Sequence, residues 1–165
     1  MEPILHFFLP LLFVLALFPK LNRRLIYIMS PLTILPDFDW FFGHRYFFHN
    51  IFFIFAISIV VYIIFDKKKI VFLLALFFLG SHLILELDRL GVGLFYPLYQ
   101  KLIGIDVGIY SSPGTTNLGF NFELITNSLS EATKMQMAPG FTKHGLFLLL
   151  LLIPLLLVKY RSIRK

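Results

Sequence analysis

The chain has 165 residues, of which 58% are hydrophobic and 15% charged, and its mean hydropathy is +0.84. Soluble domains average about 45–50% apolar and about 25% charged residues, so this composition excludes ordinary soluble, disordered and fibrous proteins and predicts an integral membrane protein. The chain has no cysteine, which excludes disulfides, thiolate metal sites and cysteine nucleophiles. The net charge of +6 is informative when the positions of the basic residues along the chain are considered.

Five apolar stretches stand out against the roughly 20 residues that cross a bilayer as a helix. They are residues 3–19, 25–36, 46–65, 70–87 and 145–158. The second is short and the fifth is modest, so we expect either of them to be tilted or broken at a proline. The sequence therefore predicts one membrane domain, residues 1–165, with an all-α bundle of four or five transmembrane helices.

Basic residues follow the odd-numbered stretches. Segments 20–24, 67–69 and 159–165 together hold 10 of the 15 lysines and arginines. One topology places all three segments on the same side, and the positive-inside rule makes that side the cytoplasm. We therefore expect a protein of the inner or plasma membrane with its amino terminus outside and its carboxyl terminus inside. Short basic clusters that flank a membrane favour anionic lipid, and not nucleic acid, as their partner.

Ionisable side chains recur at one depth of the predicted helices. At ~1.5 Å per residue, His6, Asp37, His49 and His82 lie roughly 18–24 Å above the inner boundary of a hydrocarbon core ~30 Å thick. Four predicted helices therefore bring polar groups into a shared layer near the outer face. His144 falls at a helix edge, where an interfacial position is expected.

The sharpest local motif is Leu-Pro-Asp-Phe-Asp at residues 35–39. Its two carboxylates, Asp37 and Asp39, are two positions apart after a proline and can converge on one cation. For this motif taken alone, a polar turn that ends a short helix is the alternative. The motif becomes informative only together with the other polar residues of the same layer.

A second polar segment, residues 43–50, contains His44, Arg45 and His49. We expect Arg45, together with His44, to bind a substrate anion, or Arg45 to pair with a carboxylate of the layer. Interfacial exposure of His44 and Arg45 is the alternative. His49 lies one turn into an apolar run, where a polar residue needs a partner.

The fourth apolar stretch carries His82 and Glu86, four residues apart and thus on one face of a helix. This spacing lets the two side chains chelate one metal ion, or lets Glu86 orient the imidazole of His82. Asp88 lies off that face. We expect it either to pair with Arg45 or Arg89, or to act as a general base.

Together these residues predict a metal site. An ionised carboxylate in hydrocarbon costs at least ~2.5–3.5 kcal/mol on insertion scales, and a divalent ion removes that cost. One or two ions would be held by His6, Asp37, Asp39, His49, His82 and Glu86. Mixed imidazole and carboxylate ligands favour zinc, with manganese or iron as alternatives. A salt-bridge network around Arg45 and Arg89 is the competing structural interpretation.

These motifs resemble those of the inner-membrane, LexA-regulated metal-dependent hydrolase family of bacteria and archaea. The resemblance covers residues 6–97 and rests on His6, the motif at 35–39, the segment 44–50, Ser-His at 81–82 with the acidic residues at 86 and 88, and Gly-to-Pro at 91–97. It implies a metal-dependent hydrolase. Through a further similarity to zinc-dependent phospholipase C enzymes, it implies a phosphoester substrate.

The chain departs from the family pattern at three positions. Tyr46 stands where the family has glycine, Asn50 where it has serine, and Glu86 where it has aspartate. Either Glu86, which has the family's spacing, or Asp88, which has the family's residue type, therefore corresponds to the family's helix-borne carboxylate.

Residues 98–142 form the only long polar stretch and are expected outside the cytoplasm. Residues 101–110 and 118–125 alternate between apolar and polar positions, and residues 111–117 between them are rich in turn formers. This pattern predicts a small β-hairpin on the outer face of the helical bundle.

The favoured function is a membrane-embedded, metal-dependent hydrolase that cleaves a phosphoester or ester of a lipid or amphiphile with metal-activated water. Asp88 or Asp39 would act as the general base. The alternative is a metal-ion or proton transporter that uses the same cluster, although below the layer the sequence offers only Asp66 beside three lysines. A third possibility is a non-catalytic membrane protein with a structural metal.

Overall fold

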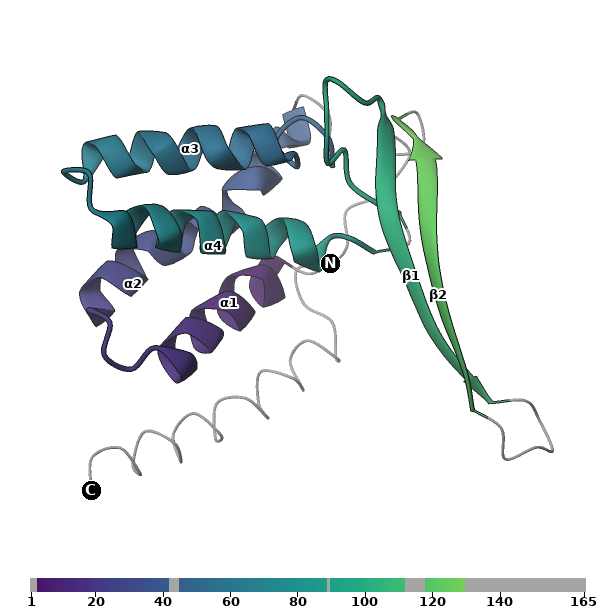
Figure 1. Cartoon of the computed structure of the whole chain (residues 1–165), viewed down its shortest axis with the longest axis horizontal. Coiled ribbons are helices and arrows are strands. Elements are labelled where there is room, and N and C mark those ends of the chain that lie inside the picture. Colours follow the sequence, from purple (N-terminus) through teal and green to yellow (C-terminus); the bar gives the residue numbers. More distant parts are fainter. Residues whose placement is uncertain (1–2, 42–44, 89, 112–117, 130–165) are drawn as a thin grey trace.

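The computed structural model describes residues 3–41, 45–88, 90–111 and 118–129. In chain order the elements are α1 (Pro3–Leu17), α2 (Arg23–Met29), the 3₁₀ helix η1 (Ser30–Phe41), α3 (Ile51–Ile64), α4 (Lys69–Leu85), β1 (Lys101–Ser111) and β2 (Leu118–Ser128). Figure 1 shows the helices packed together and the two strands extending beside them as a long arm.

Local signals set the starts of the helices. The side chain of Asn22 accepts hydrogen bonds from the backbone N–H groups of Arg24 and Leu25 at the start of α2. Asn50 caps α3 in the same way, accepting from Phe53 N at 2.8 Å. Both contacts satisfy backbone donors that the first turn of a helix leaves unpaired. They fix where α2 and α3 begin.

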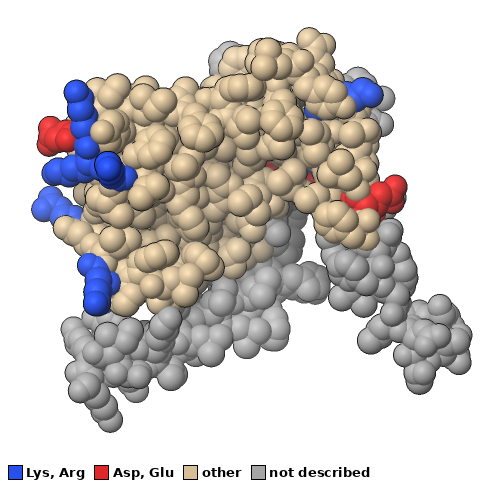
Figure 2. Space-filling model, in the orientation of Figure 1, with Lys and Arg blue, Asp and Glu red and all other residues tan. Residues whose placement is uncertain are grey.

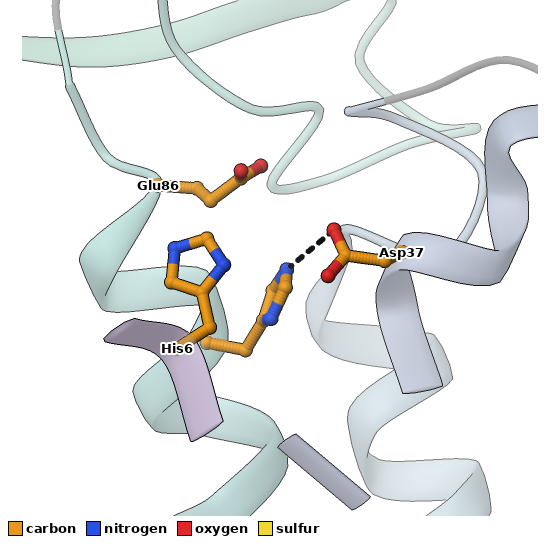
Figure 3. A group of neighbouring side chains, drawn as sticks. His6, Asp37 and Glu86 are labelled. Atoms are coloured by element: carbon orange, nitrogen blue, oxygen red, sulfur yellow. Dashed lines mark ion pairs between the residues drawn. The ribbon is translucent and has the colours of Figure 1, made fainter. Parts of the chain in front are cut away.

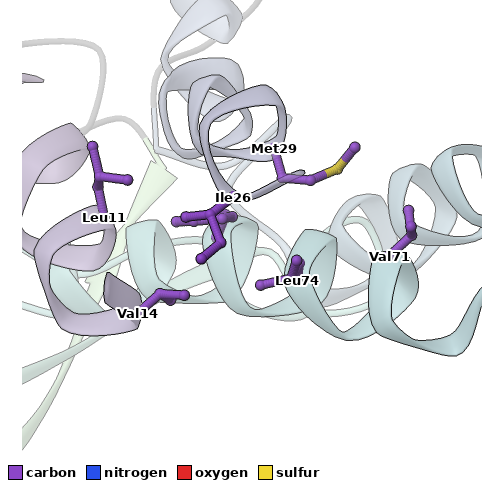
Figure 4. Close-up of a cluster of buried hydrophobic side chains, with 7 residues drawn as sticks. Leu11, Val14, Ile26, Met29, Val71 and Leu74 are labelled. Atoms are coloured by element: carbon purple, nitrogen blue, oxygen red, sulfur yellow. The ribbon is translucent and has the colours of Figure 1, made fainter. Parts of the chain in front are cut away.

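The main core lies where α1, α2 and α4 meet (Figure 4). Its buried members are Leu11, Val14, Ile26, Met29, Val71, Leu74 and Phe78. A second buried cluster, Ile54, Leu79, Leu83 and Val92, links α3 and α4 to the loop that leads into the sheet. The helices also leave large apolar side chains such as Phe13, Ile64 and Leu73 at least half exposed. An exposed apolar surface of this kind is typical of contact with another protein or with a membrane.

The predicted all-α bundle of four or five transmembrane helices is wrong. In the described part of the chain, no helix has both the length and the apolar character needed to cross a membrane. The longest, α4, has 17 residues, which span about 25 Å against a core of about 30 Å. The predicted stretch 25–36 is divided between α2 and η1, and the stretch 145–158 lies outside the described residues.

The predicted β-hairpin is confirmed. β1 and β2 pair antiparallel in a register that runs from Lys101 opposite Ser128 to Ser111 opposite Leu118. A bridge between Val92 and Ile103 attaches the base of the hairpin to the loop after α4. The alternating pattern of the sequence therefore located both strands to within three residues, because side-chain alternation is a direct consequence of the pleat.

Glycine permits the close contact at the base of the hairpin. Gly91 has φ +80°, and a Cβ at this position would lie 2.7 Å from the carbonyl carbon of Ile103. A left-handed φ and so short an approach both require a residue without a side chain. The hairpin is therefore seated directly on the loop that leaves α4, next to the polar residues described below.

Candidate metal centre

Four predicted ligands converge where α1, η1 and the end of α4 meet (Figure 3). They are His6 from α1, Asp37 from η1, His82 from α4 and Glu86, the residue that caps α4. One donor atom from each lies within 4.8 Å of the donor atoms of the other three. Two atoms bound to one tetrahedral zinc ion at about 2.0–2.2 Å are about 3.3–3.6 Å apart. The four donor atoms would thus have to approach one another by up to about 1.5 Å for one ion to contact all four.

Among the four donor residues, His6 has the environment that most strongly indicates a bound ligand. Its side chain is fully buried, and within the described ranges neither of its ring nitrogens has a hydrogen-bond partner. Its ring centroid lies 4.4 Å from that of His82. A buried polar group without a partner is destabilising. Coordination of an ion by one ring nitrogen would remove much of that penalty, so the residues present fit a metal.

The other three donor residues lie close to His6 and to one another. His82 Nε2 lies 3.6 Å from Asp37 Oδ1, the contact marked in Figure 3. The side chains of His82 and Glu86 are almost completely buried, and both come from the carboxyl end of α4, where the Glu86 N–H donates to the His82 carbonyl at 3.1 Å. Two imidazoles and two carboxylates form a donor set suited to zinc, manganese or iron.

Asp39 and His49 form a buried pair beside this group. His49 Nδ1 lies 2.7 Å from Asp39 Oδ2, the oxygen that also accepts from Phe48 N at 3.2 Å. The other ring nitrogen, His49 Nε2, lies 3.0 Å from His82 Nε2 and 3.1 Å from Glu86 Oε2. A carboxylate behind an imidazole fixes the orientation of its ring and its tautomer. Asp39 therefore lies behind His49, and His49 faces two of the four donors, His82 and Glu86.

Arg45 and Asp88 form an ion pair on the side of the hairpin. Arg45 is buried and donates from Nη1 and Nη2 to the two carboxylate oxygens of Asp88 at 2.8 and 3.2 Å, and from Nη1 to the Gly91 carbonyl at 3.3 Å. Its Nη2 also lies 3.8 Å from Glu86 Oε1. The guanidinium thus joins the segment before α3 to the loop after α4.

This pairing affects the chemistry available to both groups. Burial alone would raise the pKa of Asp88, but the hydrogen bond and the charge of Arg45, together with the backbone N–H groups of Leu90 and Gly91, outweigh it and hold the pKa below its usual value. Burial alone would likewise lower the pKa of Arg45, but the hydrogen bond to Asp88 and the charge of Glu86 raise it. An aspartate held ionised by a guanidinium is a weak base.

The structure brings together most of the residues that the sequence singled out. Asp37, Glu86 and the histidines of α1, α4 and the α3 cap segment meet as described, whereas Asp88 pairs with Arg45 and is half exposed. Pairing with Arg45 was one of the two roles expected of Asp88. His44, Arg89 and His144 lie outside the described residues. The metal-binding and catalytic roles remain predictions.

Asn50 is a positioning residue to which the motifs of the sequence assign no role. Besides capping α3, its amide Nδ2 donates to the carbonyls of Phe47 and Tyr46 at 2.6 and 3.3 Å. It therefore shapes the turn that presents His49 to the centre. An asparagine directly before an apolar helical run is a cap signal, and it was available in the sequence.

Comparisons with known proteins place the chain in a family. No curated protein and no solved structure matches it. One family model, described as YdjM inner membrane protein, matches residues 1–163. The description agrees with the expected membrane location and with the apolar side chains exposed on the helices, and it names no reaction. The chain belongs to the YdjM inner membrane protein family.

Proposed function

We propose that this membrane protein is a metal-dependent hydrolase that cleaves a phosphoester of a lipid or a similar amphiphile. The observation that carries the proposal is the buried His6, whose ring nitrogens have no hydrogen-bond partner within the described residues and which lies in a group with Asp37, His82 and Glu86. An amphiphilic substrate follows from the membrane location of the family.

In this proposal His6, Asp37, His82 and Glu86 hold one divalent ion, with zinc favoured and manganese or iron as alternatives. When bound, the ion lowers the pKa of water enough to make hydroxide available near neutral pH. Catalytic zinc sites have three protein ligands and leave one position open for water, so in this proposal water would replace one of the four donors. Asp37 is the only one of the four whose side chain is not buried.

We assign proton transfer to His49 with Asp39 behind it. Because a carboxylate can only accept a hydrogen bond, the contact at 2.7 Å places the His49 proton on Nδ1. By the same rule His49 Nε2, which lies 3.1 Å from Glu86 Oε2, donates to that carboxylate. His49 would take up the proton of the attacking water at Nε2 only once Glu86 coordinates the ion and no longer accepts from this nitrogen. Asp88 is the weaker choice of base because Arg45 keeps it ionised.

Substrate binding by Arg45 and His44 remains a prediction. Arg45 already donates to both carboxylate oxygens of Asp88 and to the Gly91 carbonyl. A phosphate would therefore contact Arg45 by exchanging with Asp88, as anions of similar geometry do at a guanidinium.

Metal content tests the proposal directly. The protein, purified in detergent and reconstituted with zinc, manganese or iron, is analysed by inductively coupled plasma mass spectrometry beside His6→Gln, His82→Gln and the exposed control Lys101→Gln. One equivalent of metal is expected in the wild type and the control, with loss in both histidine variants. A wild type that binds no metal overturns the proposal.

Hydrolysis is then measured on bis(4-nitrophenyl) phosphate and on phospholipid vesicles, with the same set of variants. Metal-dependent release of product by the wild type and by Lys101→Gln supports the proposal. Metal bound at the site with no hydrolysis of either substrate would instead favour a structural metal. Metal flux into sealed proteoliposomes, lost in His82→Gln, would favour the transporter.

A further inference from the structure

A groove lined mainly by apolar side chains lies on α3 and α4, away from the metal centre. It has a volume of about 440 Å³ and is lined by Ile59, Tyr62, Lys69, Phe72 and Leu73. The rings of Tyr62 and Phe72 meet edge to face, with centroids 6.0 Å apart. Ile59 and Leu73 are about half exposed, so the groove is open on its outer side. Volumes of this order are typical of sites for small ligands.

Positive charge lies at one end of this groove. Lys69 is part of its lining, and Lys67 and Lys68 precede it in the turn between α3 and α4, where all three are exposed. Figure 2 shows lysine and arginine side chains gathered along this end of the molecule, over the α3–α4 turn and the start of α2. Asp66, directly before the three lysines, is the acidic residue of this turn. An apolar groove with a basic rim suits a ligand with an apolar chain and an anionic head.

We propose that the groove binds an anionic phospholipid of the membrane. An acyl chain would lie against Ile59, Phe72 and Leu73, and the headgroup phosphate would contact Lys69 and its two neighbours. Basic residues next to a membrane gain favourable interaction with anionic lipid one by one. A second copy of the chain is disfavoured as the occupant, because a chain with net charge +6 would bring further positive charge to a basic rim.

The lipid in this groove is distinct from the substrate of the metal centre. Lys69 opens α4 and His82 lies near its other end, which corresponds to roughly 20 Å along the helix at 1.5 Å per residue. The groove shares no residue with the group of four donors. Binding of this lipid is therefore independent of whether the protein is a hydrolase.

Native mass spectrometry of the full-length protein in detergent tests the proposal. The protein is titrated with palmitoyl-oleoyl phosphatidylglycerol and, separately, with phosphatidylcholine that has the same acyl chains. We expect one tightly held phosphatidylglycerol, bound at least tenfold more tightly than phosphatidylcholine. Lys68→Gln and Lys69→Gln should each weaken phosphatidylglycerol binding about fivefold, and Leu73→Trp, which fills the groove, should weaken the binding of both lipids.

Lys101→Gln is the matched control, because it removes the same charge from an exposed position on β1 and should leave lipid affinity unchanged. Equal affinity of the wild type for the two lipids overturns the proposal, and so does unchanged phosphatidylglycerol affinity in Lys69→Gln. If a lysine variant fails to fold, Leu73→Trp decides with the lysines in place. A dimer that Leu73→Trp abolishes while lipid binding persists would assign the groove to a second copy.

Discussion

The buried pair of Asp39 and His49 shows how one hydrogen bond assigns a role to a side chain. Both side chains have no exposed surface, and the hydrogen bonds that Asp39 accepts from His49 Nδ1 and from Phe48 N help to stabilise its charge. A carboxylate held in this way has its oxygen directed at the histidine. Its contribution to the centre is thus to set the orientation and tautomer of His49.

Asp39→Asn tests that contribution. If His49 is the proton acceptor, the variant should keep its metal and its KM while kcat falls about 10²- to 10⁴-fold, the usual contribution of a general base. Metal content and steady-state kinetics are measured together, with Asp66→Asn, an exposed aspartate in the α3–α4 turn, as the control. Loss of metal together with activity would place His49 among the ligands and contradict the assignment.

Arg45 stabilises the fold as well as supplying a positive charge. Its guanidinium joins Asp88 and the Gly91 carbonyl and lies near the buried Glu86. Arg45→Met should destabilise the protein by about 2 kcal/mol, a value below that for a fully buried pair because the Asp88 side chain is 42% exposed. Arg45→Lys should recover part of this loss, since lysine keeps the charge without the two-pronged contact. Chemical unfolding in detergent that gave the wild-type midpoint for Arg45→Met would contradict this account.

At the scale of elements, two glycines with opposite surroundings form a natural comparison. Gly91→Ala should destabilise the protein by more than 1 kcal/mol, because φ is +80° and the new Cβ would overlap the Ile103 backbone. Gly80→Ala should stabilise it by about 0.5–1 kcal/mol, because Gly80 lies inside α4 with no atom within 4 Å of the new Cβ. Both are measured by thermal unfolding. Equal shifts of the same sign would contradict the role given to Gly91.

Periodicity predicted the elements whose geometry it directly reflects. Alternation predicted the hairpin. The four-residue spacing of His82 and Glu86 predicted one shared helix face, and the two side chains do lie in one group at the carboxyl end of α4. Helix length was not predictable in this way. Apolar composition does not indicate where a helix ends. The residues after Met29 belong to η1, although their composition predicts one continuous span from residue 25 to residue 36.

The contacts around the centre were predictable only in part. Counting residues along the predicted helices placed His6, Asp37 and His82 in a common layer, and they do meet. The sequence left Arg45 and Arg89 open as partners of Asp88 and gave no partner for Asp39, because both contacts depend on the path of the backbone between the paired residues. No spacing rule predicts that path. Arg45 itself has φ +72°, a value that a sequence pattern does not predict for a non-glycine residue.

At the scale of the whole molecule, a bound ion would act as a cross-link. Its donors come from α1, η1 and α4, which also share the packing around the main core. A ligand that binds the folded state alone stabilises it by about 2.7 kcal/mol at a free concentration 100 times its Kd. Zinc should therefore raise the unfolding temperature of the wild type, and a chelator should lower it.

His82→Gln makes that effect specific to the site. Its unfolding temperature should be the same with zinc and with chelator, whereas Lys101→Gln should respond like the wild type. The measurement needs no substrate, so it separates metal binding from hydrolysis. Zinc binding elsewhere on the surface would shift His82→Gln and the wild type equally, and that result would show that the buried donors of three elements do not share an ion. A response confined to chains with His82 intact would mean that the ion holds these elements together.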